Sequence, residues 1–350
     1  MQMKILVTGG AGFIGSAFVR HVLAHCPDFH IVTFDKLTYA GNLENLAGID
    51  GDTRHHFIQG DICDSRTVTS ILRDGDIDAI VHFAAESHVD RSILSPDRVL
   101  ETNVRGTASL LDAARIVGVR RFLQVSTDEV YGDIDLPYEA DETFPLKPSS
   151  PYAASKAAAD LLALSYLRTF GVPVLITRAS NNYGPYQFPE KLIPLMIANA
   201  IDGLPLPVYG DGLQVRDWLY VEDHCRGLLA VLEHGHEGEI YNLGGNCALT
   251  NRDVIARILD IIGAPHTLMR TVADRPGHDR RYALRSTKIA RDTGFVPWVP
   301  FETGLARTVQ WYRDNTEWTR RVRSGEYRDY YRTNYGWRGT SDITVAADRV

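Results

Sequence analysis

The residues with the clearest chemical potential form two groups in the middle of the chain. Tyr152 and Lys156 have the spacing Y-x-x-x-K, and Thr127, Asp128 and Glu129 are consecutive. Residues four apart lie on one face of a helix, so the Lys156 ammonium is expected near the Tyr152 phenol. A nearby cation favours the phenolate and lowers the tyrosine pKa, which suits a base acting on a hydroxyl group. We therefore predict that Tyr152 is a general base assisted by Lys156.

The two adjacent carboxyl groups, Asp128 and Glu129, come directly after the apolar run Phe122–Val125. A solvated loop or a helix cap would explain the pair without any chemistry, and for Asp128 alone this interpretation stays open. Neighbouring acids repel each other, which pushes their pKa values apart, so that one can be ionised while the other is protonated. Such a pair can supply the base and the acid of a reaction with two proton transfers.

A glycine-rich segment lies near the N-terminus. Residues 8–15 read Thr-Gly-Gly-Ala-Gly-Phe-Ile-Gly, which places Gly9, Gly12 and Gly15 in the pattern G-x-x-G-x-x-G. The segment follows a short apolar run and opens a helical pattern, and a second apolar run comes next. Glycines in this setting let the backbone approach a pyrophosphate, which binds at the helix N-terminus where free N–H groups point. The segment therefore predicts a dinucleotide site.

An acidic residue ends the second apolar run. Asp35 lies 20 residues after Gly15, where a carboxylate can accept hydrogen bonds from ribose hydroxyls. A carboxylate repels a 2′-phosphate, so NAD is expected rather than NADP, although Lys36 beside it weakens this argument. Asp61 follows the next apolar run and either lies near the adenine or forms a turn.

The elements that must position these residues alternate along the first half of the chain. Strands are predicted at Lys4–Val7, His30–Phe34, His56–Gln59, Ala79–Phe83, Arg121–Val125 and Val174–Arg178. Helices are predicted from the glycine-rich segment to about His25 and at Ser65–Leu72, Val99–Val117 and Tyr152–Phe170. Strands that alternate with helices predict the α/β class, a Rossmann-type doubly wound parallel sheet with helices on both faces.

The pattern changes at Gly184, where prolines become frequent and the elements shorter. We predict an NAD-binding domain at residues 1–183, a smaller lobe that mainly binds substrate at 184–338, and a disordered tail at 339–350.

The composition is that of an ordinary globular protein, with 44% hydrophobic and 23% charged residues. The net charge of −7, without a basic stripe, argues against a nucleic-acid partner. Four dispersed cysteines predict reduced thiols rather than disulfides or a metal site. Since neither a secretory signal nor a membrane-length apolar stretch is present, we expect a cytoplasmic protein with no membrane partner.

Taken together, the motifs resemble those of the dTDP-glucose 4,6-dehydratases, within the extended short-chain dehydrogenase/reductases. The resemblance runs from about residue 3 to residue 330. Related epimerases share the glycines and the Tyr/Lys pair but typically lack the Thr-Asp-Glu triplet, which is therefore the discriminating feature. The segments that carry the resemblance are residues 8–15, 35–42 (Asp-Lys-Leu-Thr-Tyr-Ala-Gly-Asn), 82–92 (His-Phe-Ala-Ala-Glu-Ser-His-Val-Asp-Arg-Ser), 126–132, 152–156 and 181–194.

The resemblance implies a reaction and a role for each residue in it. Tyr152 would take the C4 hydroxyl proton while hydride passes from C4 to NAD, and Thr127 would hydrogen-bond the C4 oxygen. Glu129 would remove the C5 proton, and Asp128 would protonate the departing C6 hydroxyl. Hydride would then return to C6, so that NAD is regenerated within one turnover.

The resemblance also implies the residues that surround cofactor and substrate. The implied NAD-binding residues are Gly9, Gly12, Phe13, Ile14, Gly15, Asp35, Lys36, Leu37, Thr38, Asp61, Ile62, Phe83, Ala84, Ala85, Thr102, Tyr152, Lys156 and Asn182. The implied nucleotide-sugar contacts are Ser87, Thr127, Asn181, Glu190, Lys191, Leu192, Pro207, Tyr209, Arg216, Asn251, Asp274, Arg275 and His278.

Three points stay open beside the resemblance. A surface ion pair of Arg216 with Asp217 or Glu222 is the alternative to a diphosphate contact. Residues 246–249 (Asn-Cys-Ala-Leu) depart from the family pattern, which puts the choice of nucleotide base in doubt. The predicted helices at 99–117 and 152–170 resemble those that pair in family homodimers, so a homodimer is expected.

Two classes of alternative function remain. The first is another enzyme on the same scaffold, namely a nucleotide-sugar 4-epimerase or decarboxylase, or a dehydratase for UDP-glucose. The second is a regulatory protein that binds a dinucleotide without catalysis. The presence of all five candidate catalytic residues argues against the second class.

Overall fold

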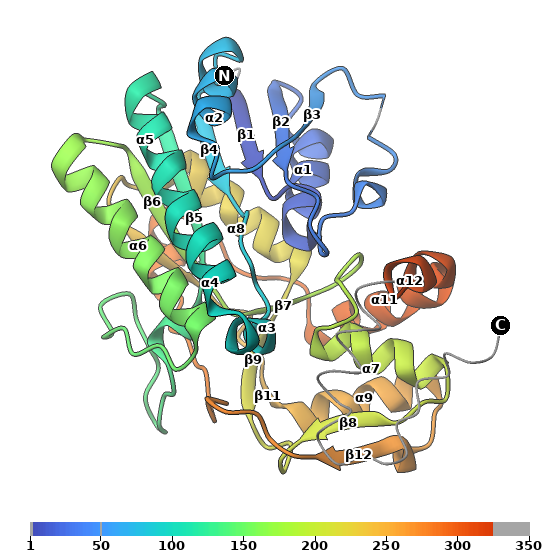
Figure 1. Cartoon of the computed structure of the whole chain (residues 1–350). Helices are drawn as coiled ribbons and strands as arrows, with labels where there is room; N and C mark the ends of the chain where they lie inside the picture. The colour runs from blue at the N-terminus through green and yellow to red at the C-terminus, as the bar shows by residue number, and fades with distance from the viewer. Residues whose placement is uncertain (1–2, 50, 325–350) are drawn as a thin grey trace.

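The main element of the computed structural model, which describes residues 3–49 and 51–324, is a seven-stranded parallel sheet (Figure 1). Its strand order is β10-β6-β5-β4-β1-β2-β3. The predicted α/β class and doubly wound parallel sheet are confirmed, whereas the predicted tail at 339–350 lies outside the described residues. The strands are β1 (Met3–Thr8), β2 (Phe29–Asp35), β3 (His55–Gln59), β4 (Ala79–His82), β5 (Arg121–Thr127), β6 (Val174–Ala179) and β10 (Ile240–Leu243).

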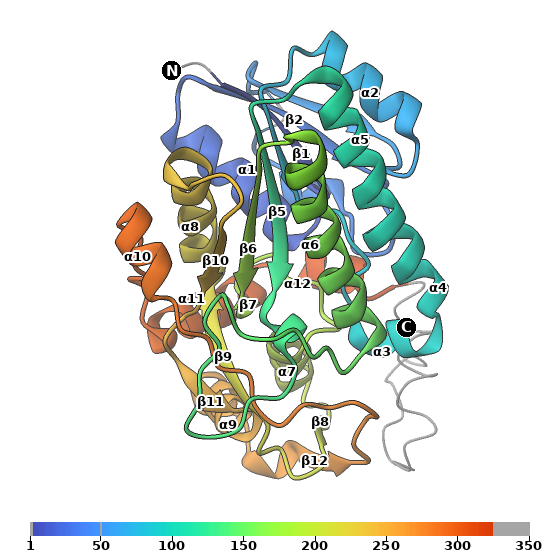
Figure 2. The same cartoon turned by 90° about the vertical axis from the view of Figure 1, so that its left-hand side faces the viewer.

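Helices cover both faces of this sheet (Figure 2). On one face lie α1 (Phe13–His25) and α8 (Val221–His234), and on the other lie α2 (Ser65–Asp74), α5 (Thr107–Val117) and α6 (Pro151–Phe170). Successive strand residues point to opposite faces, so Ile5 and Val7 pack in the first layer while Leu6 packs in the second. Because both faces are buried at the centre of the sheet, β1 and β4 are mainly apolar, whereas the edge strand β3 carries His55, His56 and Gln59 and is only partly buried.

The helical region before α5 differs from the prediction of one helix at 99–117. It consists of the short helices α3 (Val89–Leu94) and α4 (Pro96–Val99), a π-helical segment (Leu100–Gly106) and α5. Within the π-helical segment, the Asn103 amide hydrogen-bonds both backbone groups of Glu86 and the Ser155 hydroxyl. These contacts hold the segment against the loop after β4, and a π-helical turn is common beside functional sites.

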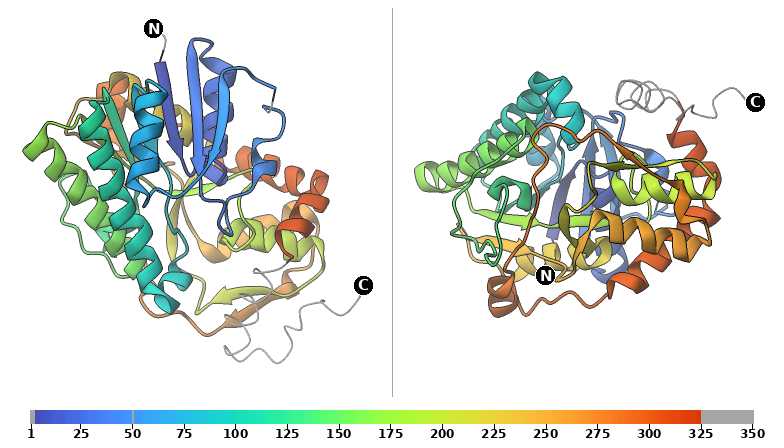
Figure 3. Two further views of the ribbon diagram at one scale, coloured as in Figure 1. Left: turned by 45° about the horizontal axis from the view of Figure 1, so that its top comes forward. Right: turned by 90° about the horizontal axis from the view of Figure 1, so that it is seen from below.

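A second hydrophobic core lies beside the carboxyl edge of the sheet (Figures 1 and 3). Its helices are α7 (Leu192–Ile201), α9 (Asn251–Ile262), α11 (Phe301–Asp314) and α12 (Thr316–Val322). A three-stranded sheet, ordered β11-β9-β7, and a two-stranded sheet of β12 and β8 complete this part. These strands are β7 (Asn181–Tyr183), β8 (Leu206–Tyr209), β9 (Val215–Tyr220), β11 (Ala248–Thr250) and β12 (Met269–Val272).

The chain does not stay in the second part after Gly184. Helix α8 packs on α1, β10 pairs with β6, and α10 (Thr287–Thr293) packs against both α8 and β10. Residues far along the chain therefore complete the sheet and one of its helical layers. Within the described residues, no helix is both long and apolar enough to cross a membrane.

Candidate active site

The site lies where the parallel strands end. The carboxyl ends of β1, β2, β4, β5 and β6 open on a cavity of about 310 Å³. A smaller cavity of about 170 Å³ adjoins it, and four residues line both: Glu129, Asn181, Glu190 and Lys191. In open α/β sheets this crevice is where ligands bind, so the two cavities form one candidate site.

The turn between β1 and α1 has the shape of a phosphate cradle. Gly9 has a φ of 70°, and a Cβ added there would lie 2.6 Å from the Ala84 nitrogen. A Cβ on Gly15 would lie 2.3 Å from the Gly9 carbonyl oxygen, whereas one on Gly12 would meet only that oxygen, at 3.2 Å. Gly9 and Gly15 are therefore required by the turn itself, and Gly12 keeps the cavity open at the start of α1.

Asp35 is held rigidly at the end of β2. Its Oδ2 accepts a hydrogen bond from the Ala11 N–H at 3.0 Å, and its Oδ1 accepts one from the Leu37 N–H at 2.8 Å. Burial raises the pKa of Asp35, and these two backbone bonds oppose that shift. The Lys36 ammonium pairs with Asp61 Oδ2 at 2.6 Å. The charge of Lys36 is thus paired with Asp61 and not with Asp35, so Lys36 no longer weakens the argument that Asp35 favours NAD.

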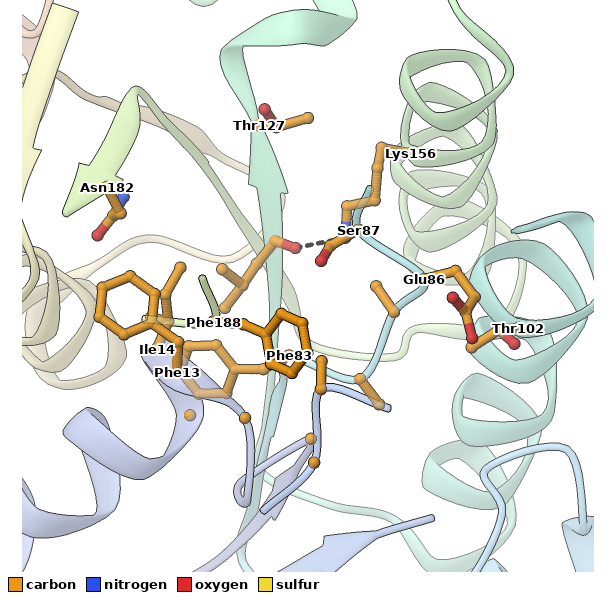
Figure 4. A pocket seen from close by; sticks show the side chains of 18 of the residues that line it. Phe13, Ile14, Phe83, Glu86, Ser87, Thr102, Thr127, Lys156, Asn182 and Phe188 are labelled. Carbon is orange, nitrogen blue, oxygen red and sulfur yellow. Dashed lines mark hydrogen bonds between the residues drawn. The ribbon is translucent and has the colours of Figure 1, made fainter. Parts of the chain in front are cut away.

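The five candidate catalytic residues line one cavity. Tyr152 and Lys156 come from the first turns of α6, Thr127 ends β5, and Asp128 and Glu129 begin the 3₁₀ helix η3 (Asp128–Tyr131). The Lys156 side chain extends from α6 toward β5, where its Nζ donates a hydrogen bond to the Val125 carbonyl oxygen at 2.7 Å (Figure 4). Residues that are 25 positions apart in the sequence thus face the same space.

The predicted effect of Lys156 on Tyr152 is wrong for this structure. Burial raises the pKa of Tyr152 well above its ordinary value, and the nearby Glu129 and Asp128 raise it further. Burial also lowers the pKa of Lys156 to about 8. The loss of hydration around a fully buried phenol therefore outweighs the attraction of one partly suppressed cation, and Tyr152 is a neutral phenol here.

The two carboxyl groups differ in their surroundings, as their predicted roles require. Asp128 Oδ1 accepts a hydrogen bond from the Thr127 hydroxyl at 3.2 Å, and Oδ2 has no partner among the described residues. Burial raises the pKa of Asp128 well above its usual range, and Glu129 adds to the shift. Burial raises the pKa of Glu129 as well, but the cations of Arg275, Lys191 and Arg216 oppose it. Asp128 is thus the protonated member of the pair and Glu129 the group that cations stabilise as an anion.

Arg216 lies in the wall of the smaller cavity and is buried. Its guanidinium donates to the carbonyl oxygens of Val215 and Asp279 at 2.8 and 2.9 Å and lies 4.2 Å from the centre of the Tyr282 ring. Asp217 instead accepts hydrogen bonds from backbone N–H groups. The alternative of a surface ion pair is therefore wrong, and the charge of Arg216 faces the cavity without a carboxylate partner among the described residues.

Nearly all the predicted contact residues line one of the two cavities. Of the implied NAD-binding residues, Leu37 alone does not line the larger cavity, and it serves through its backbone bond to Asp35. Of the implied substrate contacts, only Asp274 lines neither cavity; it binds His278 Nδ1 at 2.6 Å and Gln214 Nε2 at 3.0 Å. Residues 246–249 line neither cavity.

Several cavity residues were not predicted from the sequence. Tyr282 lines the smaller cavity, and its hydroxyl donates to Asp279 Oδ2 at 2.8 Å. Asp90 also lines the smaller cavity, where it accepts a hydrogen bond from the Tyr209 hydroxyl at 2.9 Å and pairs with Arg275 at 3.5 Å. The partners of Asp90 are more than a hundred positions away, so they leave no local sequence pattern. In the described part, no group of three or more His, Cys, Asp or Glu residues could hold a metal ion.

Comparison with known proteins supplies the family. The sequence model of a family described as GDP-mannose 4,6 dehydratase matches residues 6–308. A dTDP-glucose 4,6-dehydratase of Salmonella typhimurium is 49% identical, and the match covers 95% of this chain and 99% of the relative. The chain belongs to the dTDP-glucose 4,6-dehydratase family.

Solved structures show that the chain is more similar in sequence to a dehydratase of this family than to an epimerase of the same fold. A dTDP-glucose 4,6-dehydratase from Streptomyces venezuelae, crystallised with NAD bound, matches with a TM-score of 0.89 and 54% identity over 91% of this chain and all of that one. A UDP-glucose 4-epimerase from Thermotoga maritima, crystallised with UDP-glucose, shares the fold with a TM-score of 0.84 but 30% identity, over 90% of this chain and all of that one. The sequence likeness to the dehydratase is much the stronger of the two.

Proposed function

We propose that this protein dehydrates dTDP-glucose to dTDP-4-keto-6-deoxyglucose, as an NAD-dependent hydro-lyase. The observation that carries the proposal is the placement of Thr127, Asp128 and Glu129 opposite Tyr152 and Lys156 in one cavity. The likeness of about half the residues to dTDP-glucose 4,6-dehydratases supports it.

The residues of the larger cavity fit NAD. The cradle of Gly9, Gly12 and Gly15 at the start of α1 suits the pyrophosphate, and Asp35 suits the adenosine ribose. When bound, NAD supplies the acceptor for hydride from sugar C4 and the donor that returns it to C6, so no net oxidation occurs. Phe13, Ile14 and Phe83 give the cavity an apolar wall (Figure 4).

Each catalytic side chain then moves or holds one proton. Tyr152 first gives up its phenolic proton to solvent, and the Lys156 ammonium stabilises the phenolate that results. The phenolate then takes the proton of the C4 hydroxyl, and the Thr127 hydroxyl bonds the C4 oxygen. Glu129 removes the C5 proton, which is acidic beside the new ketone, and returns a proton to C5 when the sugar is reduced at C6. Asp128 protonates the departing C6 oxygen, so that water leaves. A base and an acid with separated pKa values are what this sequence of steps needs.

We further propose that the smaller cavity holds the nucleotide. Arg216, Arg275 and Lys191 offer positive charge to a diphosphate, and Leu192 and Pro207 offer apolar surface to a base. In this proposal residues 1–183 mainly bind NAD and residues 184–338 mainly bind the nucleotide sugar. Within the second range, β10 is a strand of the large sheet and α8 is one of the helices that cover it.

A homodimer in the cytoplasm is part of the same proposal. Large apolar side chains are exposed on the outer helices α5 and α6: Ile116 is 54% exposed, Leu161 58% and Phe170 52%. Exposed apolar side chains on these two neighbouring helices support burial against a second copy. Four free cysteines, none of them paired, fit a reducing compartment.

Incubation of the purified protein with dTDP-glucose tests the proposal. We expect a 4-keto-6-deoxy product with no accumulation of reduced cofactor, and no product from the Tyr152→Phe control. Recovery of dTDP-galactose would replace the dehydratase with an epimerase, and turnover of UDP-glucose alone would overturn only the base assignment. No turnover of either sugar would support the regulatory alternative.

A further inference from the structure

A buried pair of opposite charges lies behind the catalytic lysine. Asp160 follows Lys156 by one helical turn on α6 and is fully buried. Arg178, also buried, lies on β6 and donates from Nε to Asp160 Oδ2 at 2.9 Å. Charges removed from water are costly unless they are paired, so the position of this pair calls for a reason.

The groups around Lys156 come from three elements. Tyr152 and Asp160 lie one helical turn before and after it on α6, His82 lies on β4, and the Val125 carbonyl oxygen of β5 accepts the lysine hydrogen bond. Arg178 on β6 contacts Asp160. Burial lowers the pKa of His82 to about 3, so it is neutral, and Tyr152 is a neutral phenol. Among the described residues, Asp160 is therefore the negative group that acts on Lys156.

We propose that Asp160 is a positioning residue that keeps Lys156 in its ammonium form, with Arg178 holding the carboxylate in place. Burial lowers the pKa of Lys156, and Asp160 opposes that shift. Burial raises the pKa of Asp160, and the permanent cation of Arg178 opposes that shift in turn. The pair thus preserves one positive charge beside Tyr152 at a depth where an unpaired ammonium would lose its proton.

The charge assignment rests on the spacing of Lys156 and Asp160 on α6 and on the buried Asp160–Arg178 pair, whereas its catalytic consequence rests on the proposed function. A positive charge beside Tyr152 stabilises the phenolate when the sugar hydroxyl or its proton relay engages the phenol. Deprotonated Lys156 would remove that stabilisation. The rate should therefore fall as pH rises through the pKa of Lys156.

Asp160→Asn tests the inference because the asparagine keeps the shape and can still accept a hydrogen bond from Arg178. We expect the alkaline limb of the kcat–pH profile to move down by about one pH unit or more. NMR titration of the Lys156 side chain in the NAD-loaded enzyme should show the same displacement. An unmoved limb together with an unmoved titration would overturn the inference.

Tyr131→Phe is the matched control. The Tyr131 hydroxyl accepts a hydrogen bond from Arg178 Nη1 at 3.0 Å and donates to Asn242 Oδ1 at 2.8 Å, so its loss disturbs Arg178 without removing the Asp160 charge. We expect its alkaline limb to match that of the wild type. Equal displacement in both variants would mean that general loosening moves the limb, and the inference would be wrong.

The wild-type protein provides a measurement that does not depend on folding of a variant. Lys156 should titrate as an ammonium at pH 7 in the NAD-loaded enzyme, and a neutral Lys156 at that pH would overturn the inference. If dTDP-glucose is not turned over, the proposed function fails while the titrations still decide the role of Asp160.

Discussion

The carboxyl groups of Asp128 and Glu129 are neighbours in the chain, yet their environments are different. Arg216 alone among the nearby cations opposes the raised pKa of Asp128, whereas Arg275, Lys191 and Arg216 all oppose that of Glu129. Opposite roles for adjacent acids therefore follow from which side chains each one faces. Their neighbouring positions in the sequence do not determine these roles.

Replacing Glu129 by Gln should separate proton removal from hydride transfer. We expect exchange of the C5 proton with solvent to fall by about 10²- to 10⁴-fold, because the group that removes it is lost. Hydride transfer from C4 in a single turnover should slow much less. Deuterium incorporation at C5 and the absorbance of reduced cofactor measure the two steps.

Asp128→Asn is the matched control, since it should leave C5 exchange intact and impair the loss of water. Equal losses of C5 exchange and hydride transfer in Glu129→Gln would contradict the assignment and make Glu129 a group that only positions the sugar.

The sequence predicted the candidate residues better than it predicted their ionisation. Spacing alone brought Tyr152 and Lys156 onto one helical face, and the structure confirms that they share a cavity with the acids. The pKa of Tyr152 was predicted in the wrong direction because full burial depends on side chains from distant parts of the chain. No local pattern around residue 152 contains that information.

At the scale of elements, the glycines of the β1–α1 turn have two different functions: Gly15 allows the turn to fold, and Gly12 leaves room for the cofactor. Gly15→Ala should reduce the free energy of unfolding by about 1–3 kcal/mol, because its Cβ would overlap the Gly9 carbonyl oxygen. Gly12→Ala should lower the unfolding free energy less than Gly15→Ala does and should weaken NAD binding, because its Cβ lies 3.2 Å from the Gly9 carbonyl oxygen, a smaller overlap, and projects at the cavity. Urea unfolding and calorimetric titration with NAD measure these effects. Similar unfolding free energies for the two variants would argue against this division.

Six of the seven strands of the sheet were predicted from the sequence to within two residues at either end, because each is a short run rich in apolar residues, whereas β10 was not predicted. The π-helical segment at 100–106 was not predicted. Its contacts join Asn103 to Glu86 and to Ser155, which are 17 and 52 positions away. Strand β10 has four residues and joins the sheet only through pairing with β6, so its place depends on tertiary contacts as well.

Over the whole molecule, buried histidines should link stability to pH. Burial lowers the pKa of His82 and His224 to about 3, against about 6.5 in the unfolded chain. As the pH falls below 6.5, the unfolded chain binds protons that the folded chain refuses, so these residues favour unfolding progressively down to about pH 3. Each contributes about 1.4 kcal/mol per pH unit in that window.

The difference between wild type and His224→Gln isolates this effect from the carboxyl groups. Between pH 6 and pH 4.5, the variant should lose less unfolding free energy than the wild type, by about 1.4 kcal/mol per pH unit. Urea unfolding at several pH values measures both slopes. Parallel slopes would show that His224 accepts a proton without unfolding.

The apolar surface of α5 and α6 gives a prediction about assembly. Leu161→Glu should convert the proposed dimer to a monomer, because it places a charge in the middle of that surface. Val296, which is 57% exposed in the segment between α10 and α11, is the matched control. Val296→Glu should remain dimeric. Light scattering gives the mass of each variant, and a wild-type monomer would refute the proposed assembly.

The repeated return of the chain to the sheet limits how this protein can be re-engineered. The second core is built from three stretches, about 184–220, 244–286 and 301–322, and between them the chain goes back to place α8, β10 and α10 against the sheet. A nucleotide pocket taken from a relative would have to be grafted as three inserts at once. A single crossover after residue 183 would instead import a foreign β10 and α8 against the host's β6 and α1. Chimeras of this family are therefore expected to tolerate exchange of the three stretches together more readily than exchange of one contiguous half.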